Sequence, residues 1–205
     1  MIKFGTISTA NITPRALINP CIDEPKAQVM SIAARSKDRA EEFARWHGIS
    51  RVYDSYEEII ADDETNAFYN PLPISMHKEW TIKALRAGKH VLCEKSFASN
   101  ALEAKEMEAA GAETGLVLMD AFHYRYHPVF IRAKEIMESG EIGKVERINA
   151  AFHVPVSDPD NIRMNYNLGG GVTMDIGCYP ISWVRHLVGD EPSVTSTELE
   201  VGPPN

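Results

Sequence analysis

The stretch that decides the fold is Ala87-Gly88-Lys89-His90-Val91-Leu92-Cys93-Glu94-Lys95. Gly88 suits the end of the amphipathic helix before it, and Val91 with Leu92 is typical of a buried strand. The stretch ends on Lys95, directly after that strand. In doubly wound α/β folds, ligands bind outside the carboxyl ends of the strands, so Lys95 is a candidate functional group. The alternative is a solvated lysine at a strand end.

Short strands and helices alternate on both sides of this stretch, which predicts βαβ units and a parallel sheet. Helix starts are marked by Thr13-Pro14 and by two capping patterns, Ser55-x-x-Glu58 and Asn100-x-x-Glu103. The predicted strands are residues 2–7, 27–34, 52–53, 67–70, 90–94 and 116–120. We therefore expect an α/β fold, with a Rossmann-type doubly wound parallel sheet in a first domain of residues 1–120.

The composition changes after Asp120, where residues 121–128 are dense in aromatic side chains and histidines. We expect a helix to about Ser139, a strand over 145–154, a long loop, and a helix in which Pro180 forces a kink or a start. A last strand is expected over 194–201. These elements predict an incomplete α+β second domain over residues 121–205, whose sheet edge another copy of the chain would cover.

Composition excludes several classes of protein. The 205 residues are 44% hydrophobic and carry a net charge of −8, which predicts a soluble globular protein and argues against a nucleic-acid surface. The sequence has no apolar stretch long enough for a membrane span and no signal-peptide pattern, so we expect a cytoplasmic protein. Its three cysteines are far apart, which fits reduced thiols. His123, His127 and His153 lack a nearby carboxylate or cysteine, so no metal site is expected.

The turn after the first strand is where a dinucleotide fold would bind phosphate. Read against the pattern G-x-G-x-x-G, its glycine positions fall on Ser8, Ala10 and Thr13, so the motif by itself is weak. Small residues still permit a close approach, and Ser8, Thr9 and Thr13 add hydroxyl donors. The alternative is an ordinary turn.

The end of the second strand bears on the choice of nucleotide. Arg35, Ser36 and Lys37 stand where an NAD enzyme usually has an acidic residue, and arginine and serine suit the additional phosphate of NADP. Arg35, Lys37 and Arg39 also crowd a helix N-terminus, where cations are unfavourable by about 0.3–1 kcal/mol each unless an anion lies among them. We therefore expect NADP as the cofactor, with solvated surface charge as the alternative.

Five separated motifs carry a resemblance to a known family. They are the turn at residues 5–12, the loop at 70–77, Glu94-Lys95-Ser96, the segment 121–128, and Gly169-Gly170-Gly171 followed by Asp175-x-Gly177-x-Tyr179. Together they resemble the glucose-fructose oxidoreductase and inositol dehydrogenase family (Gfo/Idh/MocA), closest to its NADP-dependent dihydrodiol and D-xylose dehydrogenase branch. Ser96 replaces the family's proline. Family members are also longer, with a large open sheet as second domain, so we expect a C-terminally short form.

The resemblance implies an enzyme that transfers a hydride between NADP and a carbinol of a sugar or cyclic diol. Lys95, Asp175 and Tyr179 would be catalytic, without a metal. The residues implied to bind the cofactor are Ser8, Thr9, Ala10, Asn11, Ile12, Arg35, Ser36, Lys37, Pro71, Leu72, His77, Glu94, Lys95 and Arg125. The implied partners are a small-molecule polyol, sugar or diol and a second copy of the chain that pairs through the second-domain sheet, with neither nucleic acid nor membrane.

Hydride transfer at a carbinol also moves one proton. Tyr179 suits that step if a neighbouring ammonium, for which Lys95 is the candidate, lowers its pKa from about 10, and Lys95 could instead act alone. Asp175 precedes Tyr179 by one helical turn and would share its face. The structural alternatives are a helix cap for Asp175, packing for Tyr179 and a cap for His77. The functional alternatives are a nucleotide-binding protein without turnover, and transient oxidation within an elimination or hydrolysis.

Overall fold

The computed structural model describes residues 1–199, and the chain divides into two compact units. The first unit is Met1–Ala121, and the second begins at Phe122. This division lies one residue from the expected boundary after residue 120.

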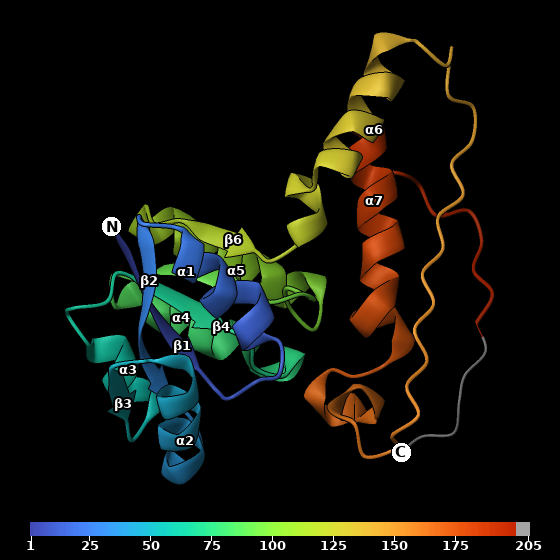
Figure 1. The fold of residues 1–205 in the computed structure, drawn as a ribbon. Coiled ribbons are helices and arrows are strands. Elements are labelled where there is room, and N and C mark those ends of the chain that lie inside the picture. The colour runs from blue at the N-terminus through green and yellow to red at the C-terminus, as the bar shows by residue number, and fades with distance from the viewer. Residues whose placement is uncertain (200–205) are drawn as a thin grey trace. The chain divides into compact units, whose positions relative to one another are not determined.

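A parallel sheet forms the middle of the first unit (Figure 1). Its six strands lie in the order β3-β2-β1-β4-β5-β6, which is the order of a Rossmann fold. The strands are β1 (Ile2–Ile7), β2 (Ala27–Ala33), β3 (Arg51–Tyr53), β4 (Ala67–Asn70), β5 (His90–Cys93) and β6 (Leu118–Asp120). All five neighbouring pairs are parallel. The predicted fold class is confirmed, and each predicted strand bound holds within two residues.

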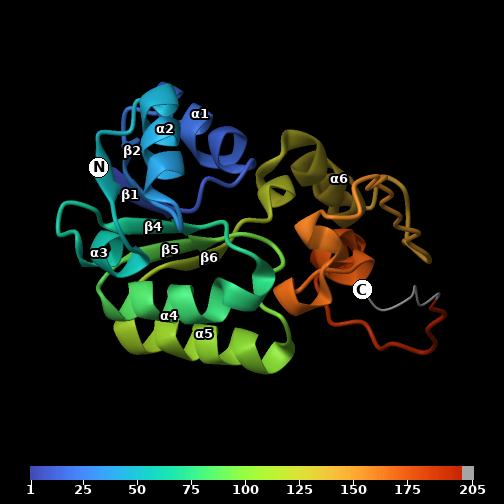
Figure 2. The same cartoon turned by 90° about the horizontal axis from the view of Figure 1, so that it is seen from below.

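Helices cover both faces of this sheet, with α4 and α5 on one face and α1 and α2 on the other (Figure 2). Phe68, Leu85 and Met107 lie in the apolar core on the α4 and α5 side, and Ile32 and Ala40 lie in the core on the other side. The helical segments of this unit are Pro14–Ile18, α1 (Asn19–Asp23), α2 (Lys37–His47), α3 (Tyr56–Ala61), Ile74–Met76, α4 (His77–Arg86) and α5 (Ala101–Thr114). Burial on both faces is complete for the central strand β4, whose four residues are all buried.

All three predicted helix starts are confirmed, and two of them carry the expected side-chain cap. Ser55 Oγ accepts a hydrogen bond from the Glu58 amide at 3.1 Å, and Asn100 Oδ1 accepts one from the Glu103 amide at 3.0 Å. The cap expected from Thr13 is wrong. Its backbone is already helical, and its buried hydroxyl has no hydrogen-bond partner among the described residues.

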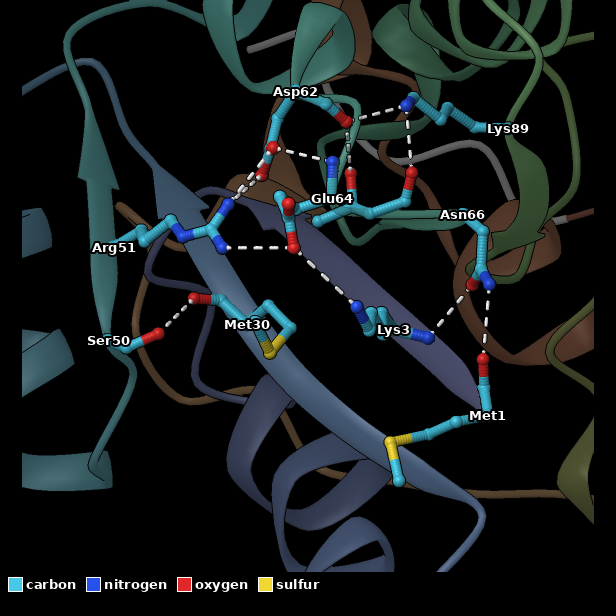
Figure 3. Close-up of polar contacts among 10 residues, drawn as sticks. Met1, Lys3, Met30, Ser50, Arg51, Asp62, Glu64, Asn66 and Lys89 are labelled. Carbon is cyan, nitrogen blue, oxygen red and sulfur yellow. Dashed lines mark hydrogen bonds and ion pairs between the residues drawn. The ribbon is translucent and has the colours of Figure 1, made fainter.

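Polar side chains close the amino-terminal edge of the sheet (Figure 3). Lys89 is buried and donates from Nζ to the carbonyl oxygens of Asp62 at 2.6 Å and Thr65 at 2.8 Å. The Asp62 carboxylate accepts from Arg51 at 3.1 Å. Asn66 accepts from the Lys3 amide of β1 and donates to the carbonyl oxygen of Met1, just before that strand. These groups satisfy one another, so this edge is structural.

The second unit is helical where it is regular. Its segments are His123–Tyr126, α6 (Pro128–Ser139), Ile162–Met164, Tyr166–Leu168, Thr173–Gly177 and α7 (Cys178–Val188). Pro180 lies in the first turn of α7, directly after the π-helical turn Thr173–Gly177. Of the two expectations, a kink or a helix start at Pro180, the structure has the helix start. Gly177 and Cys178 also have helical backbone, so Pro180 stands just after the change from π-helix to α-helix.

The strand predicted over residues 145–154 does not form. This segment has no regular structure and is mostly exposed, and residues 194–199 are also irregular, with the rest of that predicted strand outside the described residues. A strand needs a hydrogen-bonded neighbour, and residues 122–199 contain no other strand. No helix within residues 1–199 is both long and apolar enough to cross a bilayer.

Replacing Lys89 by methionine tests the closed edge. Lys89→Met keeps the aliphatic stem but removes the lysine donor from the carbonyl oxygens of Asp62 and Thr65, of which that of Asp62 keeps the Thr65 hydroxyl as a donor. The free energy of unfolding should therefore fall by about 1–3 kcal/mol. Urea unfolding followed by circular dichroism measures this loss. Lys105→Met on exposed α5 surface is the matched control, with an expected change below about 0.5 kcal/mol. Equal losses in the two variants would contradict a structural role for the Lys89 contacts.

Candidate functional site

The turn after β1 has the conformation that the glycine fingerprint demands. Ser8, at the first glycine position, has φ of 74°, which is the left-handed region and costs a non-glycine residue roughly 1–2 kcal/mol. Its amide donates to the Ala33 carbonyl oxygen at 2.7 Å, and the Thr13 amide donates to the Ala10 carbonyl oxygen at 3.0 Å. Thr9, Ala10, Asn11 and Ile12 are at least partly exposed along this turn. The sequence motif is weak, yet the backbone makes a tight turn with a left-handed residue at the first glycine position.

The basic residues after β2 have different local partners. Lys37 forms an ion pair with Asp54 at 2.5 Å, and the Ser36 hydroxyl accepts from an amide of its own helix α2. Arg35 is exposed. Arg39 donates from Nη2 to Thr9 Oγ1 at 3.1 Å, which joins this helix to the turn after β1. The two residues are 30 positions apart, so no local sequence pattern indicates their contact. The sequence predicted only that Arg39 lies near the start of a helix.

Asn70 holds the loop after β4. It is completely buried, and its Oδ1 accepts from the Leu72 amide at 3.3 Å. Its Nδ2 donates to the His77 carbonyl oxygen and to Thr81 Oγ1, both at 3.2 Å. The predicted cofactor residues Pro71 and Leu72 are thereby fixed beside the carboxyl end of the strand.

His77 links this loop to the one after β5. Its Nε2 lies 2.7 Å from the Leu72 carbonyl oxygen, and its Nδ1 lies 2.9 Å from the Ser96 carbonyl oxygen. The ring is completely buried, and burial lowers the pKa of His77. Its side chain does not cap helix α4, contrary to the structural alternative. The buried ring supports both loops from within, and direct contact between His77 and a cofactor stays a prediction.

Glu94 and Lys95 follow β5 as expected. Tyr69 donates its hydroxyl to Glu94 Oε1 at 2.7 Å, and Glu94 Oε2 accepts from the Lys95 amide at 3.2 Å. The Lys95–Ser96 peptide bond is cis. Cys93, immediately before, is buried, and that burial raises the pKa of its thiol.

Tyr179 lies in an aromatic cluster of the second unit. Its ring centroid is 5.2 Å from that of Phe122 and 5.3 Å from that of Phe152, and the residue is 9% exposed. Tyr124 packs in the same cluster and shares a 2.5 Å hydrogen bond with Ser182. Packing is therefore one established role of Tyr179.

Asp175 lies inside the helical turn Thr173–Gly177, four residues before Tyr179, so it is not the helix cap of the structural alternative. Its Oδ2 lies 3.0 Å from Nε of Arg163. The Arg163 carbonyl oxygen also accepts from the Gly171 amide at 2.8 Å, which closes the preceding loop onto the helix. Sequence reasoning missed Arg163, because a loop arginine among polar residues gives no signal of its partner.

Arg125, the remaining cofactor candidate, lies in the turn His123–Tyr126, with its guanidinium 5.8 Å from the Phe122 ring centroid. It lines an open pocket of about 310 Å³ in the second unit, together with Arg185, Asp190 and other residues at the end of α7. Within residues 1–199, no three histidine, cysteine, aspartate or glutamate side chains are grouped so that they could hold a metal.

The cofactor candidates of the first unit thus gather where its strands end. Ser8 follows β1, Arg35 follows β2, Pro71 follows β4 and Glu94 follows β5, and all four strands are parallel. Among the catalytic candidates, Lys95 belongs to the first unit, and Asp175 and Tyr179 belong to the second. Their joint action stays a prediction.

Two family models match this chain. Residues 2–122 match the Gfo/Idh/MocA oxidoreductase family with an NAD-binding Rossmann fold, and residues 130–203 match a C-terminal domain of the same family. The first match alone spans more than half of the chain.

Similar proteins include reductases and dehydrogenases. D-xylose 1-dehydrogenase (NADP(+)) 2 from Haloferax volcanii is 37% identical, covering 97% of this chain and 61% of its own. Trans-1,2-dihydrobenzene-1,2-diol dehydrogenase from Xenopus laevis is 34% identical, covering 95% and 59%. The crystal structure of a 3-ketoreductase from Actinomadura kijaniata with NADP and TDP-benzene has a TM-score of 0.86 at 35% identity, covering 91% and 57%.

This chain spans about three fifths of the length of the curated relatives that it matches. Both matched domains and the strand order agree with the resemblance noted in the sequence. The chain belongs to the Gfo/Idh/MocA oxidoreductase family.

Proposed function

We propose that this protein is an NADP-dependent oxidoreductase, which transfers a hydride between the cofactor and a carbinol of a sugar or cyclic diol. The observation that carries the proposal is the left-handed Ser8 turn at the end of β1, beside the exposed Arg35 after β2. The named relatives include NADP-dependent dehydrogenases of D-xylose and a dihydrodiol dehydrogenase. The nicotinamide supplies the hydride chemistry, so the protein must bind, orient and move one proton.

The residues present fit a dinucleotide. Ser8 has a left-handed backbone conformation, which would let the backbone of the turn approach a phosphate closely. Thr13 is completely buried in the same turn. Residues 8–12 would hold the pyrophosphate, and Pro71 and Leu72 would lie along the cofactor. Arg35 and Arg39 would bind the additional phosphate of NADP, with Ser36 and Lys37 beside them.

Tyr179 would exchange the proton with the substrate hydroxyl, and the Lys95 ammonium would stabilise its phenolate. Asp175, held by Arg163, would orient substrate hydroxyls. The solved structures of the Actinomadura reductase include variants in which a tyrosine is replaced by phenylalanine and a lysine by alanine. The same two residue types carry the chemistry proposed here.

A second candidate function is nucleotide binding without turnover. The observation that favours it is the position of Tyr179, which is 9% exposed within an aromatic cluster. If its hydroxyl serves packing alone, the first unit would still bind NADP. The expected location is the cytoplasm, where the three free cysteines would stay reduced.

We further propose that copies of the chain associate through the second unit. Tyr126 and Val129 are 64% and 71% exposed there, and Phe152 and Val154 are also exposed. Exposed apolar surface of this kind marks an interaction site. The strand pairing that the sequence predicts for this contact does not form within residues 122–199.

Sedimentation tests this association. The parent protein should self-associate at micromolar concentration, and Val129→Glu should weaken the association by about tenfold or more, since a buried charge at an interface is costly. Leu102→Glu, on the exposed surface of α5, is the matched control and should leave it unchanged. A parent protein that stays a monomer contradicts the proposal.

Cofactor preference tests the nucleotide site. NADPH should bind more tightly than NADH by over about tenfold, because a charge-assisted phosphate contact contributes about 1.5–3 kcal/mol. Arg35→Ala should remove most of this preference and leave NADH binding nearly unchanged. Arg45→Ala, at the far end of α2, is the matched control, and fluorescence titration gives all dissociation constants. Equal affinities in the parent protein would refute NADP selectivity.

The proposed proton transfer is tested by Tyr179→Phe, which keeps the ring and its packing. Tyr179→Phe and Lys95→Met should each slow hydride transfer by roughly a hundredfold, and the double variant should lose far less than the product because the two groups act as a pair. Single-turnover cofactor fluorescence measures the rate with D-xylose and with a cyclic diol. Tyr166→Phe, at an exposed position, should keep the parent rate. Full activity of Tyr179→Phe would favour the packing role.

A further inference from the structure

Tyr69 is a completely buried tyrosine that no part of the proposed chemistry uses. It lies in β4 directly opposite Leu92 of β5. Glu94 is two residues beyond Leu92, so it extends toward the same face of the sheet. Diagonal neighbours of this kind lie within reach of a long aromatic side chain, and the Tyr69 hydroxyl donates to Glu94 Oε1 at 2.7 Å.

The two oxygens of Glu94 are used differently. Oε1 accepts from Tyr69, whereas Oε2 accepts from the Lys95 amide at 3.2 Å. The carboxylate therefore connects the middle of the sheet to the first residue of the loop that carries the candidate lysine. Burial first, and then the adjacent carboxylate, raises the pKa of Tyr69. Its hydroxyl stays a donor throughout the working range of pH.

Asn70, the next residue, points to the opposite face and holds the loop after β4. Consecutive side chains of one buried strand thus support two loops at the carboxyl edge. An apolar side chain such as phenylalanine would fill the position of Tyr69 equally well. Burying a hydroxyl there costs folding free energy unless the hydroxyl is hydrogen-bonded. The bond to Glu94 is what distinguishes tyrosine from phenylalanine here.

The strand order says which part of a dinucleotide Glu94 would meet. Arg35 follows β2, on one side of the central strand β1, whereas Glu94 follows β5, on the other side. A dinucleotide lies across the crevice at the point where the strand order reverses. Glu94 consequently faces the half that NADPH and NADH share, where a carboxylate accepts from ribose hydroxyls.

We propose that Tyr69 is a positioning residue, which holds the Glu94 carboxylate in the orientation that binds a ribose diol of the cofactor. This inference rests on the proposed function. It predicts that loss of the Tyr69 hydroxyl weakens the binding of NADPH and of NADH by the same factor. Loss of the Arg35 side chain should instead remove the difference in affinity between the two dinucleotides.

The test is a double-mutant cycle of Tyr69→Phe and Glu94→Gln, read as dissociation constants of both dinucleotides by fluorescence titration. Tyr69→Phe should weaken both by about tenfold, because a hydrogen bond to a charged group is lost. Glu94→Gln should weaken both by at least as much. In the Glu94→Gln background, Tyr69→Phe should have little further effect, since Tyr69 acts through that carboxylate.

Tyr124→Phe is the matched control, because it also removes a buried, hydrogen-bonded tyrosine hydroxyl but lies in the second unit. It should leave both dissociation constants within about twofold. If Tyr69→Phe does not fold, Glu94→Asp replaces it. The shorter side chain keeps its charge but withdraws from Tyr69, and it should weaken both dinucleotides equally.

Several outcomes would overturn the inference. They are equal losses from Tyr69→Phe in the parent and Glu94→Gln backgrounds, weakening of NADPH alone, or parent-like binding by Tyr69→Phe or Glu94→Asp. A parent protein that binds neither dinucleotide would overturn the proposed function together with this inference. A parent protein that binds NADPH while Tyr69→Phe binds it equally well would overturn only the role of Tyr69.

Discussion

The parallel pairing of β1 with β4 is the constraint on which the rest of the first unit depends. The chain places β2 and β3 on one side of this pair and β5 and β6 on the other. In sheets of this order the loops diverge at that point, which is where ligands bind. Residues far apart in sequence, such as Ser8 and Glu94, consequently end at the same edge of the sheet. No local interaction would bring them there.

Buried polar groups near this edge are better explained by positioning than by stability. Asn70 and His77 are completely buried, which is costly unless each polar atom is bonded. Asn70 bonds to the Leu72 amide and to two groups of helix α4, and the His77 ring lies within hydrogen-bond distance of the Leu72 and Ser96 carbonyl oxygens. An apolar pair of similar volume would fill the space without this cost, but it would not fix the direction of either loop. The network therefore favours one arrangement of the edge over others.

Local signals explain what the sequence predicted well. Short apolar segments bounded by turn residues predicted the strands of the first unit. Ser55 and Asn100 marked the starts of two helices because both residue types cap helix N-termini. The failures involve partners distant in sequence or missing from the described chain. Residues 145–154 have the alternation of a strand but no neighbouring strand in residues 122–199 to pair with. Likewise, the contacts of Arg39 with Thr9 and of Arg163 with Asp175 depend on the fold alone.

The position of Tyr179 narrows how it could serve catalysis. Its aromatic neighbours Phe122 and Phe152 restrict the ring, which is what a proton-transfer group needs, because small displacements cost rate. The same burial excludes water, and a phenolate in such surroundings is unfavourable without a nearby cation. The ring centroid of His123 lies 6.1 Å from that of Tyr179. A buried tyrosine of this kind can exchange a proton only if an ammonium such as that of Lys95 approaches its hydroxyl. Packing of Tyr179 is therefore compatible with the proposed proton transfer, which depends on the proposed role of the Lys95 ammonium.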